Sequence, residues 1–152
     1  MALRDTLRKQ MENAEEDQRR AQQRVLNWQN AVKALYTEVG IWFDEYVHDG
    51  LLKITKEDVL RNEELSGPYN IVQFYLEFST FRAQFIPVAT YIFGAQGRVD
   101  LAIPGYRAAA AVLLLPSIDH PKQWTFSEPG QKERFVLTKA ILEDYFDKMI
   151  AR

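Results

Sequence analysis

Apolar residues recur with a seven-residue period through the first third of the chain. Two series of positions, offset from one another by four residues, are apolar at eleven of their twelve members, and the exception is Gln18. This spacing places all of them along one side of an α-helix. The pattern predicts one long amphipathic helix over residues 5–48, with Asp5 as its N-cap and Asp49 and Gly50 as its C-terminal stop. The two series are Leu7, Ala14, Ala21, Trp28, Leu35 and Trp42, and Met11, Gln18, Val25, Val32, Val39 and Tyr46.

The predicted helix is longer than a compact domain of this chain length is wide. It extends about 65 Å at a rise of 1.5 Å per residue. A compact domain of 152 residues has a diameter of about 40 Å. We therefore expect the helix to protrude from its domain unless it breaks, and the candidate breaks are Gly40 and the polar stretch 12–18.

The width of the apolar stripe divides this helix into two parts. From Val25 onward, additional apolar residues such as Leu26 and Tyr36 widen the stripe, which is typical of a helix that lies on a sheet. Before Val25 the stripe is a narrow seam, which is typical of a helix that pairs with one other helix. We expect residues 1–24 to form a protruding arm that contacts a protein partner; alternatively, residues 1–20 are a solvated tail. The residues predicted to bind the partner are Leu7, Met11, Ala14, Gln18, Ala21, Val25 and Trp28.

The rest of the chain predicts a short helix, four or five β-strands and a closing helix. Thr55 opens a capping sequence, so we expect the short helix to run from there to Leu65. Apolar alternation predicts strands over residues 69–78, 83–93, 98–103, 108–115 and 124–126, with Pro87 marking an edge, a bulge or a strand start and Gly94–Gly97 a tight turn. Helical spacing returns from Thr138. Short turns between consecutive strands favour an antiparallel meander, so we expect one α+β domain spanning residues 1–152.

Composition excludes several classes of function. The chain has no cysteine, so disulfides, thiolate metal sites and a cysteine nucleophile are excluded. A net charge of −2 gives no general attraction to nucleic acid or anionic lipid. The longest apolar run, Ala108 to Leu115, is too short to cross a bilayer, and we expect a cytoplasmic protein. His48 and His120 lack the spacing of a metal pair, so we expect neither a metal nor a cofactor.

One polar cluster could bind a small ligand or act in acid–base chemistry. Arg98 and Asp100 lie two residues apart on one face of a predicted strand, and Glu77 lies on another predicted strand. If these faces coincide, two carboxylates and a guanidinium could bind a ligand or serve a hydrolase. The alternative is a solvated sheet face with cross-strand ion pairs.

Charge is unevenly distributed along the chain. Residues 34–70 contain eight acidic and three basic residues, whereas six basic residues lie between Arg4 and Arg24. Opposite charges on two segments favour an antiparallel or head-to-tail contact between copies, or an acidic patch that meets a basic partner. We expect a non-enzymatic interaction or regulatory protein, most simply a homodimer, and its size and charge suit a bacterial or phage accessory factor that occludes a larger enzyme.

Overall fold

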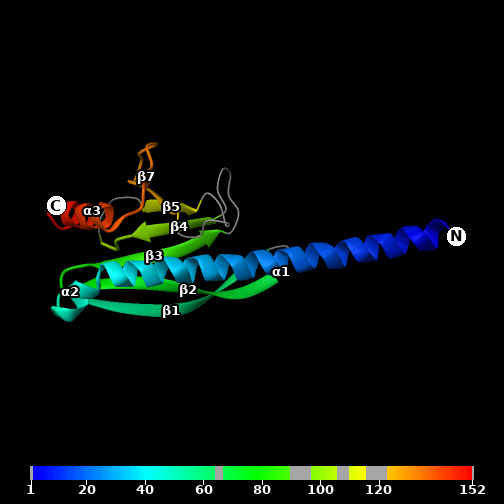
Figure 1. Ribbon diagram of the computed structural model, residues 1–152, viewed down its shortest axis with the longest axis horizontal. Coiled ribbons are helices and arrows are strands. Elements are labelled where there is room, and N and C mark those ends of the chain that lie inside the picture. Colours follow the sequence, from blue (N-terminus) through cyan, green and yellow to red (C-terminus); the bar gives the residue numbers. More distant parts are fainter. Residues whose placement is uncertain (1, 64–66, 90–96, 106–109, 116–122, 152) are drawn as a thin grey trace.

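The described residues form a seven-stranded antiparallel sheet and two main helices that share one core with it, and one of these helices extends far beyond the sheet (Figure 1). The structure, a computed structural model, describes residues 2–63, 67–89, 97–105, 110–115 and 123–151. The helices are α1 (Ala2–Trp42), α2 (Asp44–His48) and α3 (Lys139–Ile150). The strands are β1 (Leu52–Glu63), β2 (Gly67–Phe78), β3 (Arg82–Ala89), β4 (Gly97–Ala102), β5 (Ala111–Leu115), β6 (Thr125–Ser127) and β7 (Phe135–Val136). The α+β class is confirmed, but the sheet has seven strands rather than four or five.

The long helix runs from Ala2 to Trp42 instead of over residues 5–48. Asp5 lies in its first turn and is not its N-cap. Neither Gly40 nor the polar stretch 12–18 breaks the helix. The break comes at Phe43, whose side chain is buried against α3, with ring centroids 5.8 Å from Phe146. The five-residue α2 then ends at His48 with Asp49 as its C-cap, and Gly50 turns the chain with a φ of +76°.

The prediction of a short helix from Thr55 to Leu65 is wrong. Most of this segment belongs to β1, which pairs with β2 at twelve consecutive positions from Leu52 opposite Phe78 to Glu63 opposite Gly67. The local capping signal is overridden by this long hairpin, because backbone pairing along a whole strand outweighs one local helix cap. β1 and the two-residue β7 account for the strands that the alternation did not predict.

The strands follow one another in chain order across the sheet, and every neighbouring pair is antiparallel. The predicted meander is therefore correct. Each remaining strand prediction overlaps an observed strand. Residues 90–96, 106–109 and 116–122 lie outside the described part, and so does most of the turn predicted at 94–97, of which only Gly97 is described, as the first residue of β4. The closing helix begins after Thr138, whose side chain accepts a hydrogen bond from the Ile141 N–H as an N-cap.

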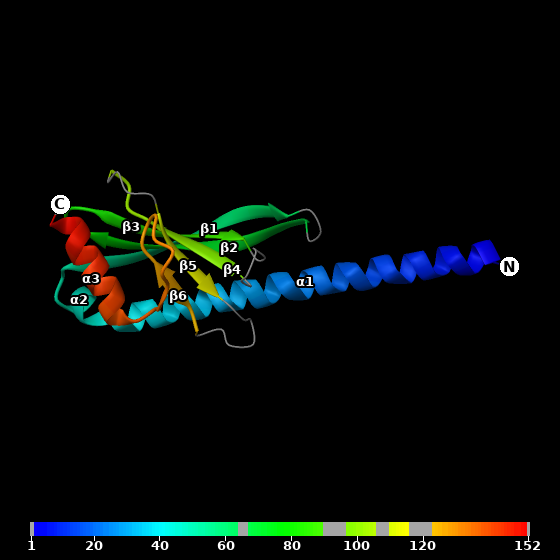
Figure 2. The ribbon, with the colours of Figure 1, turned by 90° about the horizontal axis from the view of Figure 1, so that it is seen from above.

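The second half of α1 lies along one face of the sheet, and α3 packs at the end of the sheet away from the N-terminus (Figure 2). Tyr36 stacks on Phe74 with ring centroids 4.7 Å apart. The ring centroids of Trp28 and Trp124 lie 6.2 Å apart. The Trp28 ring also lies so close to the backbone at Gly97 that no side chain fits there. These aromatic contacts join α1 to β2, to β4 and to the residue immediately before β6, and they lie in the core.

The sheet opens between β2 and β3 at Pro87. These strands pair only from Phe74 opposite Phe85 to Glu77 opposite Arg82. Continuing this register would place Val72 opposite Pro87, but proline has no N–H to donate to the Val72 carbonyl. The hydroxyl of Tyr36 donates to that carbonyl instead, at 2.7 Å.

A second side chain bridges the same opening. Arg61 on β1 donates from Nε and Nη2 to the carbonyl oxygen of Pro87, at 3.3 and 3.1 Å. The register between β3 and β4 also shifts between Pro87 and Ala89. The strand irregularity predicted at Pro87 is therefore present, and two side chains replace the strand pairing that proline prevents.

Candidate functional site

Residues 2–20 of α1, called the arm below, project into solvent beyond the sheet (Figures 1 and 2). No side chain in this fully described stretch is buried, and the first buried residue is Ala21. The arm carries three large apolar side chains at intervals of four residues. Leu3 is 67% exposed, Leu7 54% and Met11 65%. This spacing puts them on one side of the helix, where they line a shallow groove with the aliphatic parts of Arg4 and Arg8.

The seven residues predicted to bind a partner fall into two groups. Leu7, Met11, Ala14 and Gln18 are exposed along the arm. The other three are buried within the same chain and belong to the core of the fold: Ala21, Val25 and Trp28 are 1%, 8% and 2% exposed. Only the first group is available to another molecule.

Leu3 extends the exposed apolar row but was missed by the heptad pattern. It lies four residues before Leu7, outside the two heptad series. The signal that could have found it is the interval of four between Leu3, Leu7 and Met11, which an α-helix places in one row.

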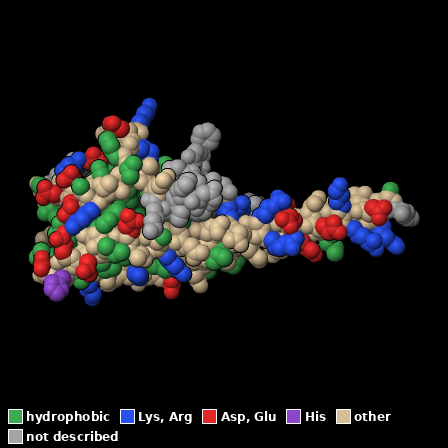
Figure 3. Space-filling view, viewed as in Figure 1, with side chains coloured by type: hydrophobic (Ala, Val, Ile, Leu, Met, Phe, Trp, Pro, Cys, Tyr) green, Lys and Arg blue, Asp and Glu red, His purple; other side chains and the backbone are tan. Residues whose placement is uncertain are grey.

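Charges alternate in blocks along the arm, as Figure 3 shows by the mixture of basic and acidic side chains around it. Arg4, Arg8 and Lys9 lie near the tip, four acidic residues occupy positions 12–17, and Arg19 and Arg20 follow. Glu16 bonds Arg19 at 2.7 Å and Arg20 at 3.5 Å. Asp17 also pairs with Arg20, at 3.9 Å. Glu16 and Asp17 of the acidic block are therefore already paired with arginines of the same helix.

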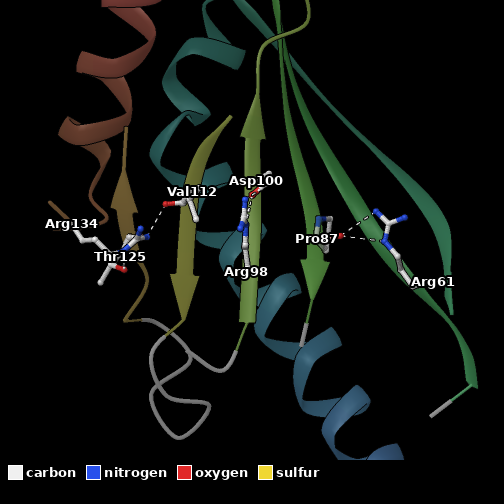
Figure 4. A network of polar contacts seen from close by, with 7 residues as sticks. All are labelled: Arg61, Pro87, Arg98, Asp100, Val112, Thr125 and Arg134. Atoms are coloured by element: carbon white, nitrogen blue, oxygen red, sulfur yellow. Dashed lines mark hydrogen bonds and ion pairs between the residues drawn. The ribbon is translucent and has the colours of Figure 1, made fainter. Parts of the chain in front are cut away.

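The polar sheet face brings together two of the three residues predicted there. Arg98 and Asp100 form an ion pair along β4, with Nε 2.7 Å from Oδ1 (Figure 4). They alternate with buried Val99 and Leu101, so they lie on the face of β4 opposite the core. Glu77 pairs instead with Arg82, 3.4 Å away across β2 and β3.

The strand registers separate Glu77 from the other two. Asp100 lies opposite Ile86 on β3, four residues along the strand from Arg82. That offset corresponds to about 13 Å along the strand direction. The face therefore carries two separate ion pairs, and joint ligand binding by Glu77, Arg98 and Asp100 stays a prediction.

Arg134 is a further polar residue on this face that sequence reasoning did not select. Its guanidinium donates to the Val112 carbonyl at 2.8 Å and to both the carbonyl and the hydroxyl of Thr125, at 3.0 and 2.9 Å (Figure 4). Burial and, to a smaller extent, the nearby Arg98 lower the pKa of Arg134 from its ordinary value. These bonds fasten β5 and β6 together, so its role is structural.

Neither the comparisons with known proteins nor the amino-acid composition indicates a chemical activity. No protein-family model, no curated protein and no solved structure matched this chain. Within the described ranges, no group of three or more histidine and acidic side chains is placed to bind a metal ion. None of the helices in those ranges is both long and apolar enough to cross a membrane. The surface that points to a function is the arm, because it exposes three large apolar side chains in one row.

Proposed function

We propose that this protein acts by protein–protein interaction and self-associates as a homodimer through the arm. The single observation that carries the proposal is the exposed row of Leu3, Leu7 and Met11 on the part of α1 that no other described element covers. Burying one such side chain contributes about 1.5–3 kcal/mol, and a dimer would bury the row twice.

An uncovered arm would also have little tertiary support for its helix. Most helical stability in proteins comes from packing of the apolar face, and the apolar row of the arm is exposed. The arm has 19 residues (2–20), and its helicity beyond the sheet would be supported by a second helix lying along the seam. Small Ala14 allows that helix to approach closely, and Gln18 would favour one register.

The second copy is the simplest partner because the arm carries both signs of charge. The basic tip of one arm is complementary in charge to the acidic middle of a second, identical arm, and the acidic middle of the first is complementary to the basic tip of the second. Two bodies joined by paired arms would present duplicated surfaces, which suits a regulatory or accessory protein that binds other molecules.

The experiment is light scattering coupled to gel filtration on the intact chain at micromolar concentration. The expected mass is twice the 17.7 kDa of one chain. The variant Leu7→Gln with Met11→Gln should elute as a monomer with unchanged β-sheet signal in circular dichroism. The matched control is Leu60→Gln, which removes an equally exposed leucine from β1 and should remain dimeric. A monomeric wild-type chain, or a dimer that is indifferent to the arm substitutions, would refute the proposal.

A further inference from the structure

The arm carries opposite charges that are not neutralised within its own helix. Arg8 near the tip and Glu15 in the acidic block form no ion pair in the part of the chain that the structure describes, whereas Glu16 and Asp17 are paired with Arg19 and Arg20. Arg8 and Glu15 are seven residues apart, so both lie on the same side of the helix, next to the apolar seam.

We infer that two arms pair antiparallel and staggered, with Arg8 of each chain beside Glu15 of the other; this inference rests on the proposed self-association through the arm. In an antiparallel pair of helices, the residue numbers of two positions that lie directly opposite each other always add to the same sum. Placing Leu7 opposite the partner's Gln18 also places Met11 opposite the partner's Ala14. Each large side chain then meets a smaller or more flexible one, which allows close packing of the two helices.

The same stagger determines which charges meet at the border of the seam. Glu15 then lies level with the partner's Gln10, which is two residues, or about 3 Å along the axis, from the partner's Arg8. Arg8 and Glu15 lie on the same flank of the seam, so Arg8 of each chain is within side-chain reach of Glu15 of the other. The contact is therefore made twice. It uses one basic and one acidic side chain that form no ion pair among the described residues.

Two competing arrangements lack this match. In a parallel, in-register pair, the acidic blocks of the two arms lie side by side, and Arg8 and Glu15 face the partner's Leu3 and Gln10 rather than each other. In an antiparallel pair shifted by one heptad, Leu7 meets the partner's Met11, but Arg8 then meets the partner's Arg8. Like charges at such positions are destabilising.

The stagger also fits the length of the arm. With Leu7 opposite the partner's Gln18, position 4 lies level with the partner's Ala21, where the partner's body begins. Each tip, including Leu3, therefore ends against the other body. The dimer is a rod with one body at each end, and the two sheets are held apart by the length of the paired arms.

Charge reversal tests the pairing in the full-length protein by sedimentation equilibrium at low ionic strength. Arg8→Glu and Glu15→Arg should each raise the dimer dissociation constant about tenfold, which corresponds to about 1.4 kcal/mol. The double variant R8E/E15R should return to within about twofold of wild type, because the opposite charges meet again with their positions exchanged. High salt should reduce these differences, since the pairs are exposed.

Two neighbouring substitutions are matched controls. Lys9→Glu and Glu12→Arg change the charge by the same amounts, but their positions point away from the seam. Each should change the dissociation constant less than threefold. Equal effects of R8E and K9E, or no recovery in the double variant, would overturn the antiparallel pairing.

Cysteine cross-linking gives an independent readout because the chain has no cysteine of its own. A mixture of Leu7→Cys and Gln18→Cys chains should be joined by a short bis-maleimide as a heterodimer, with little L7C–L7C product. Predominant L7C–L7C product from a wild-type-like dimer would overturn the antiparallel arrangement alone. A monomeric wild-type chain would instead overturn the proposed self-association.

Discussion

Replacing Tyr36 and Pro87 separately and together tests how the opening in the sheet is stabilised. Tyr36 is 2% exposed, and its hydroxyl donates to the Val72 carbonyl at 2.7 Å. Tyr36→Phe keeps the ring stacked on Phe74 but removes this donor. The contact is part-buried, and leaving a buried carbonyl without its partner costs about 1–3 kcal/mol, so we expect a loss of about 1 kcal/mol or more in the free energy of unfolding.

Pro87→Ala should make the hydroxyl dispensable. Alanine restores an N–H at the position opposite Val72 in the β2–β3 register, so strand pairing can extend across the opening. In the Pro87→Ala background, Tyr36→Phe should therefore cost less than about 0.5 kcal/mol. The difference between the two backgrounds is a coupling energy of about 0.5–3 kcal/mol.

The assay is urea unfolding followed by tryptophan fluorescence, since Trp28 and Trp124 are each 2% exposed and report on the core. All variants are compared at one protein concentration, because the proposed dimerisation would shift the apparent stability. Tyr75→Phe is the control: its hydroxyl donates to Gln73 on the same strand at 2.7 Å, so its cost should be equal in both backgrounds. An equal cost of Tyr36→Phe with and without Pro87 would refute the account of the opening.

Two further predictions concern the same core. A Cβ on Gly97 would lie 2.2 Å from Cζ3 of Trp28, so Gly97→Ala should destabilise the fold by about 1–3 kcal/mol in urea unfolding. A Cβ on Gly40 would meet nothing within 4 Å, so Gly40→Ala should instead stabilise α1 by about 0.5–1 kcal/mol. Equal effects of the two substitutions would contradict this prediction. Burial raises the pKa of Tyr36 above the 10.0 of an unperturbed tyrosine, so the folded state keeps a proton that the unfolded state loses. The contribution of Tyr36 to the free energy of unfolding should be constant below about pH 10 and fall above it by up to about 1.4 kcal/mol per pH unit. Tyr36→Phe should therefore reduce the slope of the free energy of unfolding against pH, measured from pH 9 to 11.

The predictions from sequence succeeded where one local periodicity decides the structure. The seven-residue apolar repeat identified α1 and the wider stripe after Val25, and Thr138 marked the start of α3. These signals arise from residues a few positions apart, which an α-helix necessarily brings to one side. The exposed part of the candidate site, from Leu7 to Gln18, could be predicted for the same reason.

Long-range pairing decided the rest. Residues from Thr55 onward carry a helix-capping sequence, yet they form β1 because β2 offers twelve partner positions. The width of the apolar stripe places the division of α1 near Val25 but leaves Val25 and Trp28 among the predicted partner-binding residues. The tertiary structure covers α1 from Ala21 onward, so it places both residues in the core and leaves Leu7 and Met11 in solvent. Likewise, Glu77 and Asp100 are separated by strand register, a property of the assembled sheet. The amino-acid sequence by itself determined the length and amphipathic face of the helix, whereas the contacts made by the sheet decided which part of that face is left for another molecule.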